Sequence, residues 1–185
     1  MISRLRREAG YSLIEMLVVL SIMGVVMTGL TTVFVSGSKG EDDMNRRFQA
    51  QQETRLALDR IRGDIHCSTS ATLTTVAGTP TTYKATLTAP TGASCATVSW
   101  CTVSVGGSST RFALYRQVGA TCGSASGLKV ADYLTVANAF PTYTPQSTAS
   151  LASLSVDFEV SIKGSSSVNN YGLADTIFLR NSTRA

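Results

Sequence analysis

Hydrophobic and polar positions divide the chain into three stretches. From Met16 to Ser38, 23 consecutive residues carry no ionisable side chain, which is more than the roughly 20 that a helix needs to span a bilayer. In the second stretch, up to Ile65, apolar residues recur at near-helical spacing at Met44, Phe48, Leu58, Ile61 and Ile65. From Cys67 onward, short apolar runs alternate with Thr, Ser, Gly and Asn, as is typical of strands and turns.

The first two stretches predict one long helix over residues 11–66. Residues 13–38 form its transmembrane part, and residues 39–66 form an amphipathic stem. The 55 residues from Tyr11 to Ile65 would span about 82 Å at ~1.5 Å per residue. This length lets the stem lie against a globular head formed by residues 67–185.

Six segments of the head are predicted to be strands: 71–76, 82–88, 96–103, 111–117, 151–162 and 176–180. Strict alternation over residues 154–162 is typical of a half-buried antiparallel strand. Two hairpins are expected, one pairing residues 69–76 with 82–89 and one pairing 97–104 with 111–118. The predicted fold class is therefore α+β, with a long N-terminal helix packed on an antiparallel sheet.

Charge is arranged in blocks. The formal net charge is +4, and Arg4, Arg6, Arg7 and Glu8 supply half of it before residue 10. Between Lys39 and Asp64, six basic residues are balanced by six acidic ones. This balance favours a solvated face with salt bridges. Nucleic acid as a partner has no support from the pattern.

The basic start and the apolar run have three interpretations. In the first, a signal peptide is cleaved near residues 36–38, which the long apolar run and its carboxylate, Glu15, disfavour. In the second, a signal anchor keeps the N-terminus in the cytoplasm and exports the residues after Ser38. That interpretation leaves Glu15 unexplained.

The third interpretation rests on Gly10 and the residues after it. A short basic leader, Met1 to Gly10, is followed by Tyr11 and then by Ser12-Leu13-Ile14-Glu15 at the start of the apolar run. This segment resembles the prepilin signature of the type IV pilin and type II secretion pseudopilin superfamily, in which the first mature residue is most often Phe. The stretch from Leu56 to Ile65 also resembles the end of the stem in minor pilins and J-type minor pseudopilins.

The resemblance implies a sequence of processing and assembly steps for the chain. A prepilin peptidase would cut after Gly10 and N-methylate Tyr11. The mature subunit, with a lollipop fold, would be held in the inner membrane with its head exported. It would then join other subunits in a filament with the help of an inner-membrane assembly platform.

Glu15 then acquires a physical role. An ionised carboxylate in a bilayer costs roughly 2.5–3.5 kcal/mol, so it needs a partner. Cleavage would create a cationic amine at Tyr11, four residues before Glu15. The carboxylate could pair within its own chain, helped by the helix N-terminus, or with the amine of a neighbouring subunit, as the resemblance implies. Both alternatives stay open at the level of sequence.

The head contains four cysteines: Cys67, Cys95, Cys101 and Cys122. An even number on the exported side predicts two disulfides. The first hairpin would bring Cys67 near Cys95 and leave Cys101 for Cys122, whereas the second would bring Cys95 near Cys122. The first pairing is slightly favoured. No metal site is expected, because the spacings contain no C-x-x-C pair.

Catalysis is not expected. The sequence has no Gly-rich phosphate loop, no G-x-S-x-G motif and a single histidine, His66, and no cofactor is predicted. The favoured function is a minor pilin or pseudopilin subunit incorporated into a type IV pilus or a type II secretion-like filament. The alternative is a signal-anchored extracytoplasmic binding or adhesion domain that does not polymerise.

Overall fold

The computed structural model describes residues 11–76, 82–92, 94–162 and 170–182. The chain forms two compact units, residues 1–45 and residues 46–185. Each unit is described by itself. The predicted leader, Met1 to Gly10, lies outside the described residues.

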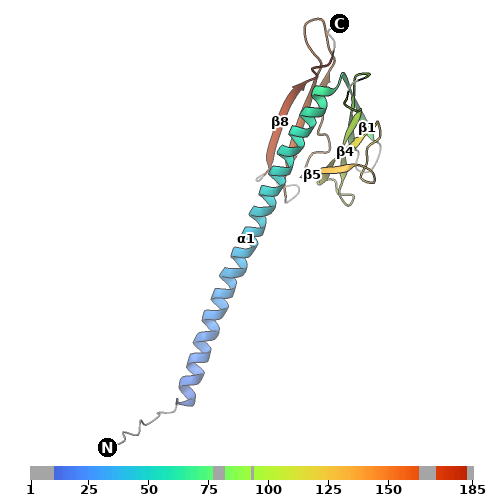
Figure 1. The fold of residues 1–185 in the computed structure, drawn as a ribbon. Coiled ribbons are helices and arrows are strands. Elements are labelled where there is room, and N and C mark those ends of the chain that lie inside the picture. Colours follow the sequence, from blue (N-terminus) through green and yellow to red (C-terminus); the bar gives the residue numbers. More distant parts are fainter. Residues whose placement is uncertain (1–10, 77–81, 93, 163–169, 183–185) are drawn as a thin grey trace, which may run out of the picture. The chain divides into compact units, whose positions relative to one another are not determined.

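A single helix, α1, runs from Leu13 to Cys67 (Figure 1). It begins two residues later than expected and ends one residue later. At its last turn the backbone N–H of Ser68 donates to the Ile65 carbonyl at 3.1 Å, and the Ser68 hydroxyl donates to the Asp64 carbonyl at 2.7 Å. These bonds satisfy two carbonyls that the end of a helix leaves without partners.

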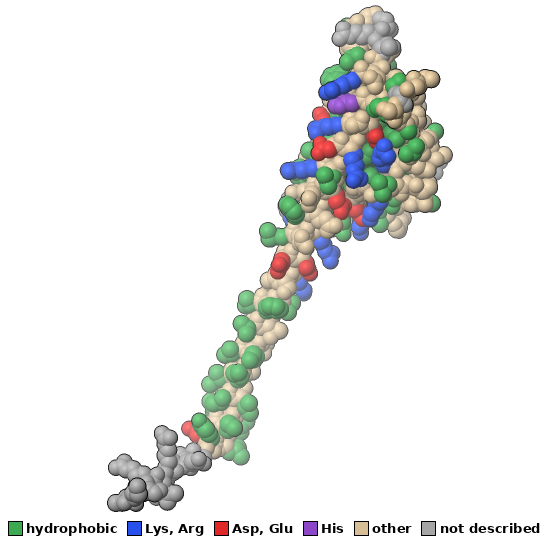
Figure 2. Space-filling view, in the orientation of Figure 1, with side chains coloured by type: hydrophobic (Ala, Val, Ile, Leu, Met, Phe, Trp, Pro, Cys, Tyr) green, Lys and Arg blue, Asp and Glu red, His purple; other side chains and the backbone are tan. Residues whose placement is uncertain are grey.

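The first unit contains the apolar part of α1. Every residue from Leu13 to Glu41 is exposed, and in Figure 2 hydrophobic side chains follow this part of the helix. By length and composition, α1 is the one described helix able to cross a membrane. Three threonine hydroxyls, on Thr28, Thr31 and Thr32, donate to carbonyls four residues back, so they need no water in an apolar medium.

The second unit is an antiparallel sheet packed on the remainder of α1. Its strands are β1 (Ser70–Val76), β2 (Thr82–Thr88), β3 (Val98–Ser104), β4 (Phe112–Val118), β5 (Leu128–Leu134), β6 (Tyr143–Thr144), β7 (Ser153–Val160) and β8 (Tyr171–Phe178). The strand order is β1-β2-β3-β4-β5-β7-β6, with β8 paired to β7. Both expected hairpins are present as β1–β2 and β3–β4. The predicted α+β class is confirmed.

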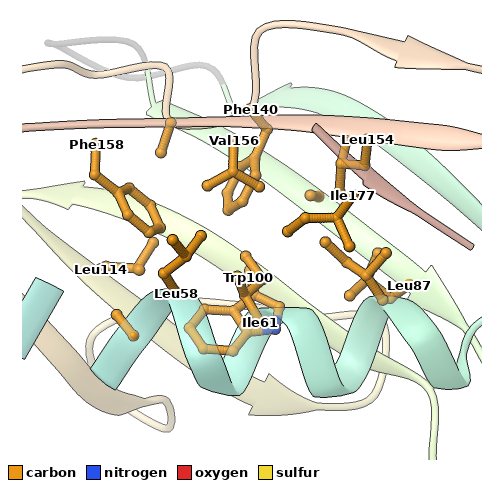
Figure 3. Packing of buried hydrophobic residues seen from close by; sticks show 14 of the residues in the cluster. Leu58, Ile61, Leu87, Trp100, Leu114, Phe140, Leu154, Val156, Phe158 and Ile177 are labelled. Carbon is orange, nitrogen blue, oxygen red and sulfur yellow. The ribbon is translucent and has the colours of Figure 1, made fainter. Parts of the chain in front are cut away.

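The core of the head lies between the stem and the sheet. Helix residues Ala57, Leu58, Ile61 and Ile65 are buried together with apolar side chains of β2, β3, β4, β7 and β8. In Figure 3, Leu58 and Ile61 lie on the opposite side of this core from Val156. The predicted alternation in β7 is present, since Leu154, Val156, Phe158 and Val160 are all buried.

The strand predictions are incomplete at the end of the chain. They do not include β5 and β6, and the predicted last strand, residues 176–180, is wrong because β8 covers Tyr171–Phe178. β8 contains Gly172, Ala174 and Asp175, which have low strand propensity. Its pairing with β7 along eight consecutive positions outweighs that local preference. β5 is irregular, because its register with β4 shifts twice and its residue Tyr133 has a φ of 64°.

Candidate processing and assembly site

The predicted processing site lies at the start of α1. Tyr11 and Ser12 precede the first helical residue, Leu13. Tyr11 is 84% exposed. Gly10, the residue after which cleavage is predicted, lies outside the described residues. The predicted new N-terminus, Tyr11, thus lies at the exposed start of the helix.

Glu15 turns back toward this end. Its Oε2 atom accepts a hydrogen bond from the backbone N–H of Ser12 at 3.1 Å. Ser12 stands at the N-cap and Glu15 three residues later, which is the arrangement of a capping box. One of the four N–H groups that a helix start leaves unpaired is thereby satisfied, and the carboxylate lies at the positive end of the helix dipole. In the single chain, Glu15 thus has a partner within its own helix.

The surroundings of Glu15 are apolar. Ile14, Val18 and Val19 lie with Tyr11 and Glu15 around one shallow hollow on the helix surface. The Ser12 N–H is a neutral donor, so it does not balance the charge of a carboxylate that enters lipid. A cation at Tyr11 or on a neighbouring chain would supply the balance. This role of Tyr11 and Glu15 stays a prediction.

A second polar cluster joins the stem to the sheet. The Asp64 carboxylate accepts hydrogen bonds from Trp100 Nε1 at 2.8 Å and from Arg116 Nε and Nη2 at 2.8 and 2.9 Å. The hydrogen bond to Asp64 raises the pKa of Arg116 further above its usual range. Asp64 is therefore a partly buried link between helix and sheet.

The balanced charges of the stem predict that Asp64 lies on a solvated face, but its side chain is only 17% exposed. A signal for its real position exists, because Asp64 directly precedes the buried Ile65 and follows the buried Ile61 by three residues. It therefore lies at the border of the buried stripe. The partner could not be found in the same way, since Arg116 lies 52 residues away.

The other flank of the stem contacts β8. Arg62 Nη2 lies 2.8 Å from Asp175 Oδ2, and Arg62 Nη1 lies 3.2 Å from Asp59 Oδ1. The Arg55 side chain donates to the Tyr171 hydroxyl at 3.1 Å. The predicted salt bridges on the stem are thus present around Arg62. This arginine pairs with a residue of β8 and with a residue of α1 itself.

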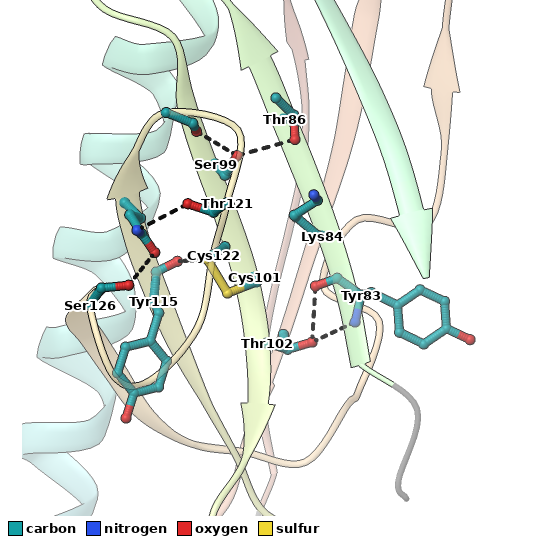
Figure 4. Close-up of a disulfide and its surroundings, with 12 residues drawn as sticks. Tyr83, Lys84, Thr86, Ser99, Cys101, Thr102, Tyr115, Thr121, Cys122 and Ser126 are labelled. Carbon is teal, nitrogen blue, oxygen red and sulfur yellow. Dashed lines mark hydrogen bonds between the residues drawn. A yellow bond between two sulfur atoms is a disulfide. The ribbon is translucent and has the colours of Figure 1, made fainter. Parts of the chain in front are cut away.

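The four cysteines form two disulfides, Cys67–Cys95 and Cys101–Cys122. The first ties the last residue of α1 to the connection between β2 and β3. The second ties β3 to the loop after β4, which folds back over the outer face of the sheet (Figure 4). Because of this return, Cys122 meets Cys101 and not Cys95, although the second hairpin forms as expected.

Three side chains of metal-ligating type, Asp64, His66 and Cys67, lie close together in the sequence at the end of α1. Cys67 is in a disulfide, and Asp64 is bonded to Arg116 and Trp100. Burial, with Arg180 and Arg62 nearby, lowers the pKa of His66. Over residues 11–76, 82–92, 94–162 and 170–182, no group of three metal-ligating side chains comes together.

An apolar helix able to cross a membrane, with a glutamate that caps its start, leads into a disulfide-linked sheet, and these features fit a protein with a single N-terminal membrane anchor. Residues 5–31 match the family model described as the prokaryotic N-terminal methylation motif. The resemblance to the type IV pilin and pseudopilin superfamily is thereby confirmed for this segment. The motif is typical of structural subunits whose precursors a prepilin peptidase processes. No curated protein and no solved structure matched the chain.

Proposed function

We propose that the chain is a minor pilin or pseudopilin, cut after Gly10 and incorporated into a type IV pilus or a type II secretion-like filament. The observation that carries this proposal is the methylation motif at residues 5–31, placed on a helix whose apolar side chains are all exposed from Leu13 to Val35. Such a surface needs lipid before assembly and neighbouring helices after it.

The route to the filament follows from the chemistry of the N-terminus. The precursor is a single-pass protein of the inner membrane with its basic leader in the cytoplasm, since Arg4, Arg6 and Arg7 precede the apolar run. Cleavage replaces this leader with a single cationic amine at Tyr11. Other pilin-like subunits and an inner-membrane assembly platform are the partners of the mature chain.

Glu15 changes partners along this route. In the free subunit it accepts the Ser12 N–H, and in the filament it pairs with the Tyr11 amine of a neighbouring subunit. The exchange is favourable because an ion pair in a medium of low dielectric is stronger than a hydrogen bond to a neutral N–H. The capping bond keeps the carboxylate from being unpaired before the neighbour arrives.

The N-terminus of the mature protein tests the proposal. Intact-mass measurement and N-terminal sequencing of membrane-extracted protein should give a chain that begins at methylated Tyr11. Gly10→Glu should block cleavage and leave membrane insertion intact, because the apolar run is unchanged. A mature chain that starts at Met1, or beyond Ser36, would contradict the proposal and favour the signal-anchored domain that does not polymerise.

A further inference from the structure

The two disulfides pair the cysteines in chain order. Cys67 is joined to Cys95, 28 residues later, and Cys101 to Cys122, 21 residues later. The two closed loops therefore neither overlap nor enclose one another. A chain exported from its N-terminal side presents both members of the first pair before either member of the second.

One wrong pair competes with this order. Cys95 and Cys101 are six residues apart, so they close a much shorter loop than either native pair does. In an unfolded chain the shorter loop is entropically easier to close. Native pairing therefore needs something that keeps Cys95 and Cys101 apart.

The sheet provides this separation. Cys101 lies within β3, three residues after Val98, and three residues of strand span about 10 Å. A disulfide needs Cα atoms about 4.4–6.8 Å apart, so once β3 is extended Cys95 could reach Cys101 only if the chain reversed over the strand.

The direction of the Cys101 side chain separates it further from Cys95. Trp100 points to the stem, where its Nε1 donates to Asp64, and side chains alternate along a strand. Cys101 therefore lies on the opposite face, which the returning loop covers (Figure 4). Cys95 is held at the end of α1 by Cys67.

From this arrangement we propose that the head is a substrate for a dithiol oxidase and needs no disulfide isomerase. In each pair one cysteine thiolate attacks the disulfide of the oxidase, which releases one oxidase thiol and leaves a mixed disulfide. The second cysteine thiolate then attacks the chain-side sulfur and releases the second oxidase thiol. Two electrons pass from the chain to the oxidase for each bridge, and the two thiol protons end on the reduced oxidase.

The experiment uses the full chain, reduced in detergent and then oxidised by a purified dithiol oxidase in its disulfide form, with no isomerase present. Peptide mapping without reduction should show Cys67–Cys95 and Cys101–Cys122, with loss of the Cys95–Cys101 cross-link relative to a sample oxidised in concentrated urea. Accumulation of Cys95–Cys101 in detergent alone, converted to native pairs only after isomerase is added, would overturn the proposal.

A paired variant tests whether the bridges form independently. In the double variant Cys67→Ser with Cys95→Ser, the Cys101–Cys122 bridge should form at an unchanged rate, since its partners approach through β3, β4 and the following loop. Loss of this bridge in the variant would show that the first pair directs the second. Neither experiment depends on filament assembly, so its outcome is separate from that of the proposed function.

Discussion

At the scale of single residues, Glu15 has the clearest consequence. The sequence predicts its importance, because a carboxylate at the start of a membrane-spanning run of 23 uncharged residues is costly. Its partner in the free chain could not be chosen from sequence, since Ser12 and Tyr11, three and four residues before Glu15, both lie within one helical turn of it. The structure shows the cap, through the bond from Ser12.

Replacing Glu15 tests the change of partner. Glu15→Val should insert into the membrane at least as well as the native chain, because an apolar residue replaces a charged one. Recovery in sheared filaments should fall, because the buried Tyr11 amine would lose its partner, a change commonly worth about 3–5 kcal/mol.

The matched control is Glu41→Val, which removes an exposed carboxylate beyond the apolar run of the same helix. This control should be recovered in filaments like the native chain at equal membrane levels. Equal recovery of Glu15→Val would show that Glu15 serves only its own helix.

Asp132 is the second residue with a measurable signature. Burial alone would raise the pKa of its carboxyl group, but the Tyr133 N–H, Lys129 and Arg111 outweigh burial and lower it. The Tyr133 N–H donates to Asp132 Oδ1 at 2.7 Å, where Tyr133 has a positive φ that a non-glycine residue rarely adopts. The carboxylate therefore supports a strained backbone.

The sign of the pH dependence follows from this lowered pKa. The stabilising contribution of Asp132 is present above the pKa of the unfolded chain, about 3.9, and is lost as the pH falls through the lower folded value. In urea unfolding followed by the fluorescence of Trp100, Asp132→Asn should lose less stability than the native chain on acidification. Asp157→Asn, at an exposed position, should keep the native pH profile. An unchanged profile in Asp132→Asn would contradict the assignment.

At the scale of elements, α1 could be predicted almost to its ends, whereas β5 and β8 could not. A long helix carries a repeated signal, namely the uncharged run and then the stripe through Leu58, Ile61 and Ile65. A strand such as β8 is determined by its neighbour: its residues pair with β7 at every position, although Gly172 and Asp175 disfavour strands locally. A local sequence pattern contains no information about which distant strand a segment will pair with.

The link between α1 and the sheet should contribute measurably to stability. Asp64→Ala would leave Arg116 and Trp100 Nε1 without their acceptor. Hydrogen bonds to charged groups are worth about 1.5–3 kcal/mol, and we expect a loss in this range in urea unfolding of the full chain in detergent. Asp59→Ala, on the exposed side of the same helix turn, should change the free energy of unfolding by less than about 0.5 kcal/mol. Similar losses in both variants would contradict the role of Asp64 as a link between helix and sheet.

At the scale of the whole molecule, the head combines a modest core with two covalent bridges. The sequence predicted the number of bridges but left their connectivity open, because register and loop path decide which cysteines meet. The loop after β4 settles it, since it carries Cys122 to Cys101; directly after Cys122 the Gly127 N–H donates to the Gly123 carbonyl at 2.9 Å and closes a tight return. An added Cβ at Gly127 would lie 2.6 Å from the Gly123 oxygen, so the return requires a glycine.

Removing one bridge should weaken the head by a predictable amount. Cys101→Ser with Cys122→Ser should lower the free energy of unfolding by about 2–4 kcal/mol, because the unfolded chain regains the freedom of a 21-residue loop. Urea unfolding of the native and double-variant chains in detergent measures this difference. The reduced native chain should be less stable than the double variant, since it lacks both bridges. Equal stability with and without reductant would contradict both statements.

The position of Cys67 at the last residue of α1 also has a mechanical consequence. When α1 is pulled along its axis, tension arriving at Cys67 divides between the backbone leading into β1 and the covalent bond to Cys95. The disulfide transmits part of the force directly toward β3. This part does not pass through the 28-residue stretch that contains β1 and β2. The first hairpin can therefore stay folded under a pull that would otherwise peel it from the sheet.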